Sequence, residues 1–552
     1  MKRRDLLKQL AISVPALAMT RHLNAASGYL PGVYSPLITQ GPFQPNWNSL
    51  AAYRVPDWFR NAKFGIWAHW GPQCQPEAGD WYARNMYIEG SNQYKKHLEK
   101  YGHPSKFGFK DVIHTWKAEK WNPEDLVSLY KKAGARYFMA LANHHDNLDL
   151  YNSRYQTKWN STKVGPKKDI IGGWEKAARK IGLPFGVSVH AAHAWSWYEV
   201  AQKADKSGPF AGVPYDGKMT KADGKGLWWE GLDPQELYAQ NHALSDGSEN
   251  EANIHQQWNW GNGVCVPSKA YCEIFLNRTL DLINTYNPDL VYFDDTALPL
   301  WPISEAGLKI AAHFYNKSIK QNGKLDAVIF GKILDEQQRR CMVWDIERGQ
   351  SNQIEPLPWQ TDTCIGGWHY DRGIYDKKRY KSAQTVIHTL CDVVSKNGNL
   401  CLNIPVRGDG TIDELERGIV EEVGQWMAVN SEAIYDTRPW TIFGEGPALD
   451  NAAPLTRQGF NEGKGKSFTS ADIRFTTQGD HIYAIAFGWP EEGKLTVKSM
   501  KEDSVHMQKK INSVEMLETG AKLSFTRNQE GLHIVLPERK SLLSYAVVLK
   551  IS

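Results

Sequence analysis

Two aspartates that end an apolar stretch in the middle of the chain are well suited to chemistry. Residues 290–293 read Leu-Val-Tyr-Phe, and Asp294 and Asp295 follow directly. Burying two carboxylates without partners would be costly, so we expect both at the exposed end of a strand. A carboxylate placed there could attack an electrophilic carbon, take up a proton, or cap the next helix.

A further carboxylate ends a second apolar stretch. Residues 342–346 precede Glu347, and the guanidinium of Arg348 could orient its carboxylate. Glycoside hydrolysis requires two carboxylates, one acting at the anomeric carbon and the other protonating the leaving oxygen. Their separation decides between retention and inversion of configuration, and both outcomes stay open at this point. The simpler alternative is a surface Glu-Arg pair.

Histidines follow two other apolar stretches. His69 comes after residues 64–68, and His144 and His145 come after residues 137–143. Such imidazoles could bind substrate hydroxyls, ligate a metal or stabilise a loop. Adjacent side chains at a strand end point to opposite sides, so substrate contacts are favoured over joint ligation of one metal.

These side chains meet only if the fold brings strand ends together. From about residue 58 to 440, short apolar runs alternate with amphipathic segments, which is typical of βα units. A parallel barrel gathers the carboxyl ends of its strands at one mouth, where barrel enzymes assemble their sites. The sequence therefore predicts an α/β protein with a TIM-like (β/α)8 barrel, regular or irregular. Seven of the eight strands can be recognised, at 64–70, 137–143, 185–191, 290–295, 327–330, 342–347 and 399–405.

The chain divides into three parts. We predict an export signal at 1–26, a catalytic barrel at 27–440 and a C-terminal β-sandwich at 441–552, where short alternating runs are separated by Gly, Pro and Asn. Residues 199–263 are polar and poorly periodic, so they are expected to form a long insertion at one barrel mouth. Clear helices are expected at 123–133, after Asn122, and at 269–286, after Ser268.

The N-terminus predicts export. Lys2, Arg3 and Arg4 precede an apolar run at 10–19, and small residues follow near Ala25. The Arg3-Arg4 pair resembles a twin-arginine signal, which predicts a periplasmic protein. No later apolar stretch approaches the roughly 20 residues that span a bilayer, so no membrane span is expected.

Composition narrows the partner. The net charge of +4 is small for 552 residues and no basic block is present, which argues against a nucleic-acid partner. The 22 Trp and 24 Tyr favour carbohydrate, because aromatic faces stack on sugars. The sequence predicts an oligosaccharide or polysaccharide substrate and leaves the oligomeric state open.

Several longer motifs resemble glycoside hydrolase family 29, the α-L-fucosidases, from about residue 56 to 440. The motifs are KFGIWAHWGP from Lys63, DWYARNMY from Asp80, KKAGARYFMALANHHD from Lys131, WNSTKVGPKKD from Trp159, PDLVYFDD from Pro288 and DVVSKNGNLCLNIPVRGDGTID from Asp392. The resemblance implies a TIM-like barrel followed by a β-sandwich, an exo-acting retaining double displacement, and no metal or other cofactor.

The resemblance also implies residue roles by position. It places the nucleophile on Asp294, with Asp295 as its rival, and the acid/base on Glu347, with Glu355 and Glu336 as competitors. The implied substrate contacts are His69, Asp80, Trp81, Tyr82, His144, His145, His190, Tyr292, Asp295 and Lys332.

Departures from the family pattern leave the sugar open. His190 stands near where many members carry a tyrosine, and Lys332 near where many carry an arginine. Fucose is 6-deoxy-L-galactose, and a pocket discriminates weakly against one added hydroxyl. An α-L-galactosidase acting on algal polysaccharide is therefore an alternative. A noncatalytic sugar-binding protein on the same scaffold and a metal-dependent hydrolase are two further alternatives.

Overall fold

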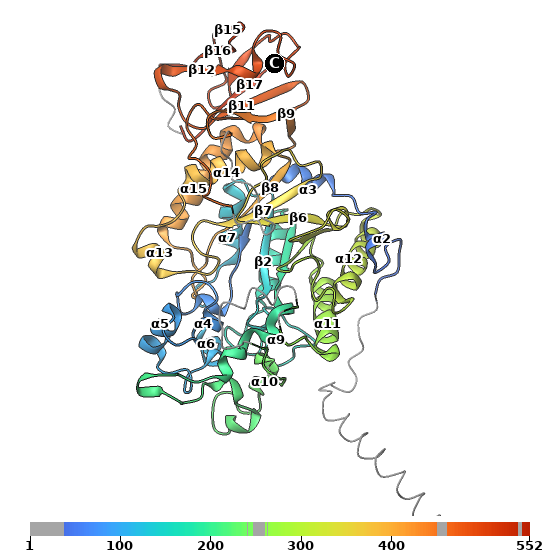
Figure 1. The fold of residues 1–552 in the computed structure, drawn as a ribbon, viewed down its shortest axis with the longest axis vertical. Helices are drawn as coiled ribbons and strands as arrows, with labels where there is room; N and C mark the ends of the chain where they lie inside the picture. Colours follow the sequence, from blue (N-terminus) through green and yellow to red (C-terminus); the bar gives the residue numbers. More distant parts are fainter. Residues whose placement is uncertain (1–37, 240, 247–259, 262, 450–460, 539–543) are drawn as a thin grey trace, which may run out of the picture.

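A computed structural model describes the greater part of the chain (Figure 1). The predicted export signal at 1–26 lies outside the described residues. Among the residues that are described, no helix is long and apolar enough to cross a membrane. The described ranges are 38–239, 241–246, 260–261, 263–449, 461–538 and 544–552.

Eight parallel strands form a closed barrel in sequence order, with β8 hydrogen-bonded back to β1. The barrel is followed by antiparallel sheets, so the predicted fold class is confirmed. The strands are β1 (Phe64–Ala68), β2 (Tyr137–Asn143), β3 (Phe185–Val189), β4 (Leu290–Phe293), β5 (Val328–Gly331), β6 (Val343–Glu347), β7 (Trp359–Cys364) and β8 (Gly398–Asn403).

The strand that the sequence did not reveal is β7. Its sequence, Trp-Gln-Thr-Asp-Thr-Cys, contains no apolar run, yet all six residues are buried. The side chains of Gln360, Thr361 and Thr363 are hydrogen-bonded inside the protein. Gln360 donates to Asp345 Oδ1 on β6 at 2.8 Å, and the hydroxyl of Thr361 donates to Ile346 O at 2.8 Å. Satisfied hydrogen bonds therefore replace apolar contacts in this strand.

Helices surround the barrel, and the two predicted helix starts are confirmed. Asn122 accepts from Asp125 N before α7, and Ser268 accepts from Tyr271 N before α11, so each side chain satisfies a free N–H of the first turn. The α-helices are α2 (Trp47–Leu50), α3 (Asp57–Ala62), α4 (Tyr82–Asn85), α5 (Asn92–Tyr101), α6 (Phe109–Thr115), α7 (Pro123–Lys132), α8 (Ile170–Lys180), α9 (Ala194–Trp197), α10 (Pro234–Tyr238), α11 (Lys269–Tyr286), α12 (Ala306–Asn322), α13 (Arg372–Asp376), α14 (Ala383–Ser395) and α15 (Glu414–Asn430).

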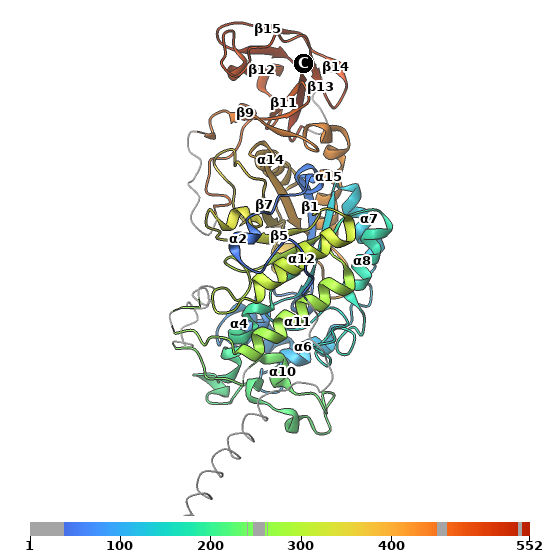
Figure 2. The ribbon, with the colours of Figure 1, turned by 90° about the vertical axis from the view of Figure 1, so that its right-hand side faces the viewer.

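Two antiparallel sheets follow α15 and occupy one end of the long axis (Figures 1 and 2). Side chains from both sheets, including Phe475, Leu495 and Leu549, share one core, as in a β-sandwich. One sheet has the order β14-β13-β17-β11-β10-β9 and the other the order β12-β16-β15. Their bounds are β9 (Arg438–Glu445), β10 (Ile473–Gln478), β11 (His481–Ala486), β12 (Lys494–Val497), β13 (Val514–Met516), β14 (Ala521–Lys522), β15 (Phe525–Arg527), β16 (Leu532–Val535) and β17 (Val547–Ile551).

Residues 199–239 of the insertion contain short 3₁₀ turns and α10. They pack on the loop after β2, where Asn147 donates to Leu237 O at 2.9 Å. In both views α10 lies at the end of the molecule opposite the C-terminal sheets (Figures 1 and 2). The insertion therefore borders the carboxyl end of the barrel.

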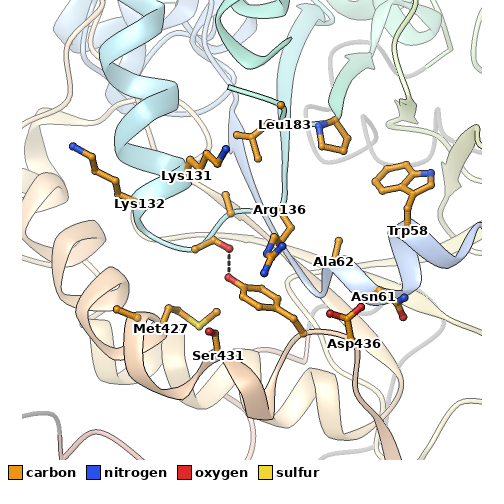
Figure 3. A pocket seen from close by; sticks show the side chains of 16 residues that line it. Trp58, Asn61, Ala62, Lys131, Lys132, Arg136, Leu183, Met427, Ser431 and Asp436 are labelled. Carbon is orange, nitrogen blue, oxygen red and sulfur yellow. Dashed lines mark hydrogen bonds between the residues drawn. The ribbon is translucent and has the colours of Figure 1, made fainter. Parts of the chain in front are cut away.

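A cavity of about 600 Å³ lies at the amino ends of β1 to β3 (Figure 3). Its lining includes Lys131, Arg136 and Tyr435, and the guanidinium of Arg136 lies 4.0 Å from the centre of the Tyr435 ring. Asp294, which follows β4, and Glu347, the last residue of β6, lie at the other mouth of the barrel. In barrel enzymes this amino-terminal face serves stability, and active sites lie at the opposite, carboxyl-terminal mouth.

Candidate active site

The carboxyl ends of the barrel strands surround a cavity of about 450 Å³. That volume falls within the roughly 300 to 1,000 Å³ typical of ligand pockets. The predicted site residues that line it are His69, Asp80, Trp81, His144, His190, Tyr292, Asp294, Lys332 and Glu347.

Asp294 follows β4 and faces this cavity. Its Oδ1 lies 2.6 Å from Lys332 Nζ, and its Oδ2 lies 3.2 Å from both His145 Nε2 and His190 Nδ1. Burial would raise the pKa of Asp294, but Lys332 and the two histidines outweigh it and hold that pKa well below its usual range. Asp294 is therefore an oriented anion at neutral pH.

Asp295 lies behind the cavity wall. It is 1% exposed and accepts from His193 Nε2 at 3.2 Å. Successive side chains at a strand end point to opposite sides. Of the two aspartates, Asp294 is thus the one that a substrate can reach, and the structure does not bring Asp295 to the cavity as a substrate contact.

A lysine joins the two candidate catalytic carboxylates. Lys332 follows β5, and its ammonium contacts Asp294 and also Glu347 Oε2. Burial would lower the pKa of Lys332, but the surrounding carboxylates hold it well above its usual range. Because one nitrogen touches both carboxyl groups, their nearest oxygens are at most about 5 Å apart. Such closeness is compatible with the carboxyl separation of about 5 to 5.5 Å in retaining glycosidases.

The two rival glutamates lie away from this pair. Glu355 is bonded by Ser351 at 2.6 Å in the connection after β6, and Arg339 lies 3.5 Å from it. Glu336 is exposed. Among these three glutamates, Glu347 is the one that lines the cavity.

Left-handed backbone follows both members of the Lys332-Glu347 pair. Ile333 and Arg348 each have φ of 44°. That region is sparsely populated by residues other than glycine and is unusual for a β-branched residue such as Ile333. These turns redirect the chain directly after each strand end, so the preceding side chain is aimed into the cavity. Backbone strain of this kind is often found at functional sites.

Imidazoles line the wall facing these charges. Burial lowers the pKa of His69 and of His144 well below the usual range, and it lowers that of His190 to about 4. The rings are therefore neutral at neutral pH, and each offers one donor and one acceptor nitrogen. Within the described part of the chain, neither ring nitrogen of His69 has a hydrogen-bond partner. Such groups suit a polyhydroxylated ligand.

Two residues after β7 complete this wall, and sequence reasoning missed both. Trp368 and His369 line the cavity, where the His369 ring lies 4.8 Å from that of His69 between ring centres. Asp80 holds them through its carboxylate, which accepts from the backbone N–H of Trp368 at 3.2 Å and of His369 at 2.6 Å. The unrecognised β7 explains the omission, since Gly366-Gly367 marks its end.

Two groups of three histidines have ring nitrogens within 4.8 Å of one another. Neutral imidazoles at that spacing could ligate a transition metal, and they could equally surround sugar hydroxyls. The metal hypothesis began from the His144-His145 pair, but both nitrogens of His145 face protein atoms, at His190 O and Asp294 Oδ2. The groups are His69, His144 and His369, and His144, His145 and His190.

A pair of buried carboxyl groups, Asp345 and Asp362, lies next to Glu347 on β6 and β7. Burial raises the pKa of Asp345 to about 7, and burial together with Asp345 raises that of Asp362 well above its usual range. Two adjacent carboxylates in an apolar barrel cannot both ionise readily, so the pair retains a proton. Asp362, which lines the cavity, was also missed because β7 was not recognised.

Two predicted substrate contacts occupy other positions. Tyr82 begins α4 and is fully buried, and its hydroxyl lies 2.6 Å from His97 Nδ1. The structure therefore places Tyr82 in the packing between α4 and α5 instead of at the cavity. His145 is also fully buried, and it orients Asp294 from behind.

Comparison with known proteins adds independent information. The family model for α-L-fucosidase matches residues 35–432, and that for the α-L-fucosidase C-terminal domain matches residues 466–552. Tissue α-L-fucosidase of Rattus norvegicus is 24% identical over 509 residues, covering 90% of this chain and 89% of the relative.

Solved structures share the fold. A structure of the Thermotoga maritima α-fucosidase has a TM-score of 0.65 and 25% identity, and covers 92% of this chain and 100% of its own. A Thermotoga maritima α-L-fucosynthase in complex with α-L-Fuc-(1-2)-β-L-Fuc-N3 has a TM-score of 0.66 and 25% identity, with coverage of 93% and 100%.

Proposed function

Because the chain belongs to the α-L-fucosidase family, and so is a glycosidase, we propose that it releases terminal α-L-fucose from oligosaccharides or polysaccharides by an exo-acting, retaining double displacement. Asp294 is the nucleophile and Glu347 the acid/base. The observation that carries the assignment is Lys332, whose one ammonium contacts both carboxylates within the cavity. No other chemistry considered for this chain needs two carboxylates so arranged.

In the first step Asp294 attacks the anomeric carbon, and protonated Glu347 gives its proton to the departing glycosidic oxygen. The bond from the sugar to the leaving oxygen breaks as the bond to Asp294 forms. Negative charge thereby moves from Asp294 to Glu347. Lys332 already touches both groups, so it can follow this charge without crossing the cavity.

In the second step Glu347, now a carboxylate, removes a proton from water. The water attacks the anomeric carbon from the side that the leaving group vacated, and Asp294 is released as a carboxylate. Two displacements at one carbon give net retention of configuration. The hydrogen-bonding histidines that face Asp294 then hold the regenerated anion for the next cycle.

The remaining cavity groups are suited to holding a sugar ring. Neutral His69 can donate to one hydroxyl and accept from another, whereas His144 and His190, whose Nδ1 atoms face Gln73 and Asp294, each offer Nε2. Trp81 and Trp368 offer aromatic faces on the same cavity. The fucosynthase structure, which holds a fucosyl disaccharide, supports a fucose-sized occupant.

The test is side-by-side hydrolysis of p-nitrophenyl α-L-fucoside and p-nitrophenyl α-L-galactoside by the wild type and Asp294→Ala. Fast release from the fucoside that the substitution abolishes is the expected result. A preference for the galactoside would make the protein an α-L-galactosidase with the same residues. Release that survives Asp294→Ala would refute the nucleophile assignment.

The acid assignment is tested by the leaving group. Glu347→Ala is expected to retain kcat/KM for 2,4-dinitrophenyl α-L-fucoside, whose leaving group needs little protonation, and to lose kcat/KM for fucosyl disaccharides. Equal loss on both would refute the role of Glu347. The twin-arginine-like motif at Arg3-Arg4 supports the further proposal that the enzyme works in the periplasm.

A further inference from the structure

Glu462 lies outside the barrel, on the connection between β9 and β10 of the C-terminal sheet, and yet it contacts the ends of two barrel strands. We infer that Glu462 is a positioning residue for Glu347, holding the ends of β6 and β7 together so that the acid/base keeps its place in the cavity. The inference rests on the proposed acid/base role of Glu347.

The contact with β6 is made one residue beyond Glu347. The backbone N–H of Glu462 donates to Arg348 O at 2.9 Å, and Glu462 Oε2 accepts from Arg348 Nε at 3.2 Å. Two further bonds join Asn461 to Gln350, at 2.8 and 3.0 Å. Arg348 has left-handed backbone, so these bonds hold the strained turn that aims Glu347.

The contact with β7 uses the other carboxylate oxygen. Glu462 Oε1 accepts from Thr363 Oγ1 at 2.7 Å and from Lys381 Nζ at 2.7 Å. Lys381 also donates to Cys364 O at 2.7 Å, at the last residue of β7. One side chain of the C-terminal part therefore bridges two neighbouring strand ends of the barrel.

The strands that Glu462 bridges carry the acid side of the site. Glu347 and Asp362 are register partners on β6 and β7, and Arg348 N donates to Asp362 O at 2.8 Å. That bond is the last between these strands before the chain turns at Arg348. Thr363 is directed to Glu462, while Asp362, its neighbour in sequence, lines the cavity.

Glu462 remains a carboxylate in this setting. Burial would raise its pKa, but Lys381, Thr363 and Arg348 outweigh burial and lower it. These are the charged and polar groups that face it from the ends of β6 and β7 and from the segment before α14. Charge-assisted hydrogen bonds of this kind are stronger than neutral ones.

Small displacements of an acid/base are costly. A misplacement of about 1 Å lowers turnover by roughly 10²-fold. Removing Glu462 leaves Arg348 and Lys381 as neighbouring cations without their shared carboxylate, so the two strand ends are expected to separate. The defect should then resemble partial loss of acid catalysis rather than loss of substrate binding.

The experiment compares Glu462→Ala and Glu462→Gln with the wild type on 2,4-dinitrophenyl α-L-fucoside and on a fucosyl disaccharide. For the disaccharide, Glu462→Ala should lower kcat/KM, which reports the glycosylation step, by roughly 10- to 100-fold. For the dinitrophenyl substrate the loss of kcat/KM should be less than about threefold, because its leaving group needs little protonation. Glu462→Gln keeps acceptor oxygen for Thr363 and Lys381 and should recover part of the disaccharide activity.

Glu432→Gln is a matched control. Glu432 also joins the barrel to the C-terminal sheet, through Lys550 at 2.6 Å and Tyr483 at 2.7 Å, but touches neither β6 nor β7. It should leave the ratio of the two activities unchanged. Melting temperatures of all variants show whether each is folded, and Glu462→Gln serves as the test if the alanine variant is not.

The outcomes separate the two claims. If Glu347→Ala shows no dependence on the leaving group, the acid assignment fails and the positioning role fails with it. If Glu347→Ala shows that dependence while the Glu462 variants lower both activities equally, or neither, the positioning role alone is refuted.

Discussion

Replacing Lys332 by methionine removes the one ammonium that contacts both Asp294 and Glu347. Methionine keeps the length of the side chain and its apolar stem but leaves the two carboxyl groups facing each other. In the wild type, Lys332 holds the pKa of Asp294 well below its usual range against the opposing effect of burial. In the variant, His145 and His190 alone support the anion.

The magnitude follows from the geometry. Removing the ammonium withdraws about 4 kcal/mol of attraction for the Asp294 carboxylate, for charge centres about 4 Å apart and an effective dielectric constant near 20. At 1.36 kcal/mol for each tenfold change, this moves the acidic limb of the kcat/KM profile upward by about three pH units. Loss of hydrogen bonds to charged groups, about 1.5 to 3 kcal/mol each, lowers kcat/KM at neutral pH by roughly 10- to 100-fold.

The assay is the pH dependence of kcat/KM on p-nitrophenyl α-L-fucoside for the wild type, Lys332→Met and Lys332→Arg. Arginine restores the positive charge between the carboxylates and should return the acidic limb close to its wild-type position, with a smaller loss of rate. A methionine variant whose acidic limb stays in place and whose kcat/KM is unchanged would refute the role assigned to the ammonium.

Three further outcomes are expected. Burial raises the pKa of Asp345 from 3.8 to about 7, so the folded state binds one more proton than the unfolded state, and the free energy of unfolding should fall as pH rises between about 4 and 7. Asp345→Asn should flatten the fall in melting temperature over this pH range. An unchanged fall in the variant would contradict the raised pKa. Turnover should be unchanged in the presence of a chelator. Added Zn²⁺ should inhibit competitively, because the ring nitrogens of His69, His144 and His369 lie within 4.8 Å of one another. Loss of activity in the chelator would instead favour a metal-dependent hydrolase. Changing Arg3 and Arg4 together to lysine should leave the precursor in the cytoplasm by cell fractionation, and normal export would exclude the twin-arginine route.

Much of the barrel could be predicted because its strands are apolar runs buried on both faces. Seven such runs were recognisable, and β7 was not. Its Gln360 donates to Asp345 on β6, and burial together with Asp345 raises the pKa of its Asp362 well above the usual range. No count of apolar residues detects a strand that is buried in that way.

The site was predictable where a side chain ends a recognised strand, as for Asp294, Glu347 and His69. It was not predictable where long-range packing decides the direction of a side chain. Tyr82 is turned away by a bond to His97, and Asp295 by one to His193. His97 and His193 lie on other elements than the residues they contact, and the sequence does not show that these side chains meet.

The left-handed backbone of Ile333 affects how the thermal stability of this protein can be raised. A β-branched residue held there stores strain of about 1 to 3 kcal/mol. Asparagine tolerates the same conformation more easily, so Ile333→Asn should relieve part of that strain, while Lys332 beside it becomes less constrained. Selection for heat resistance and selection for turnover therefore oppose each other at this position. A substitution of Ile333 chosen by melting temperature alone is therefore expected to lower turnover.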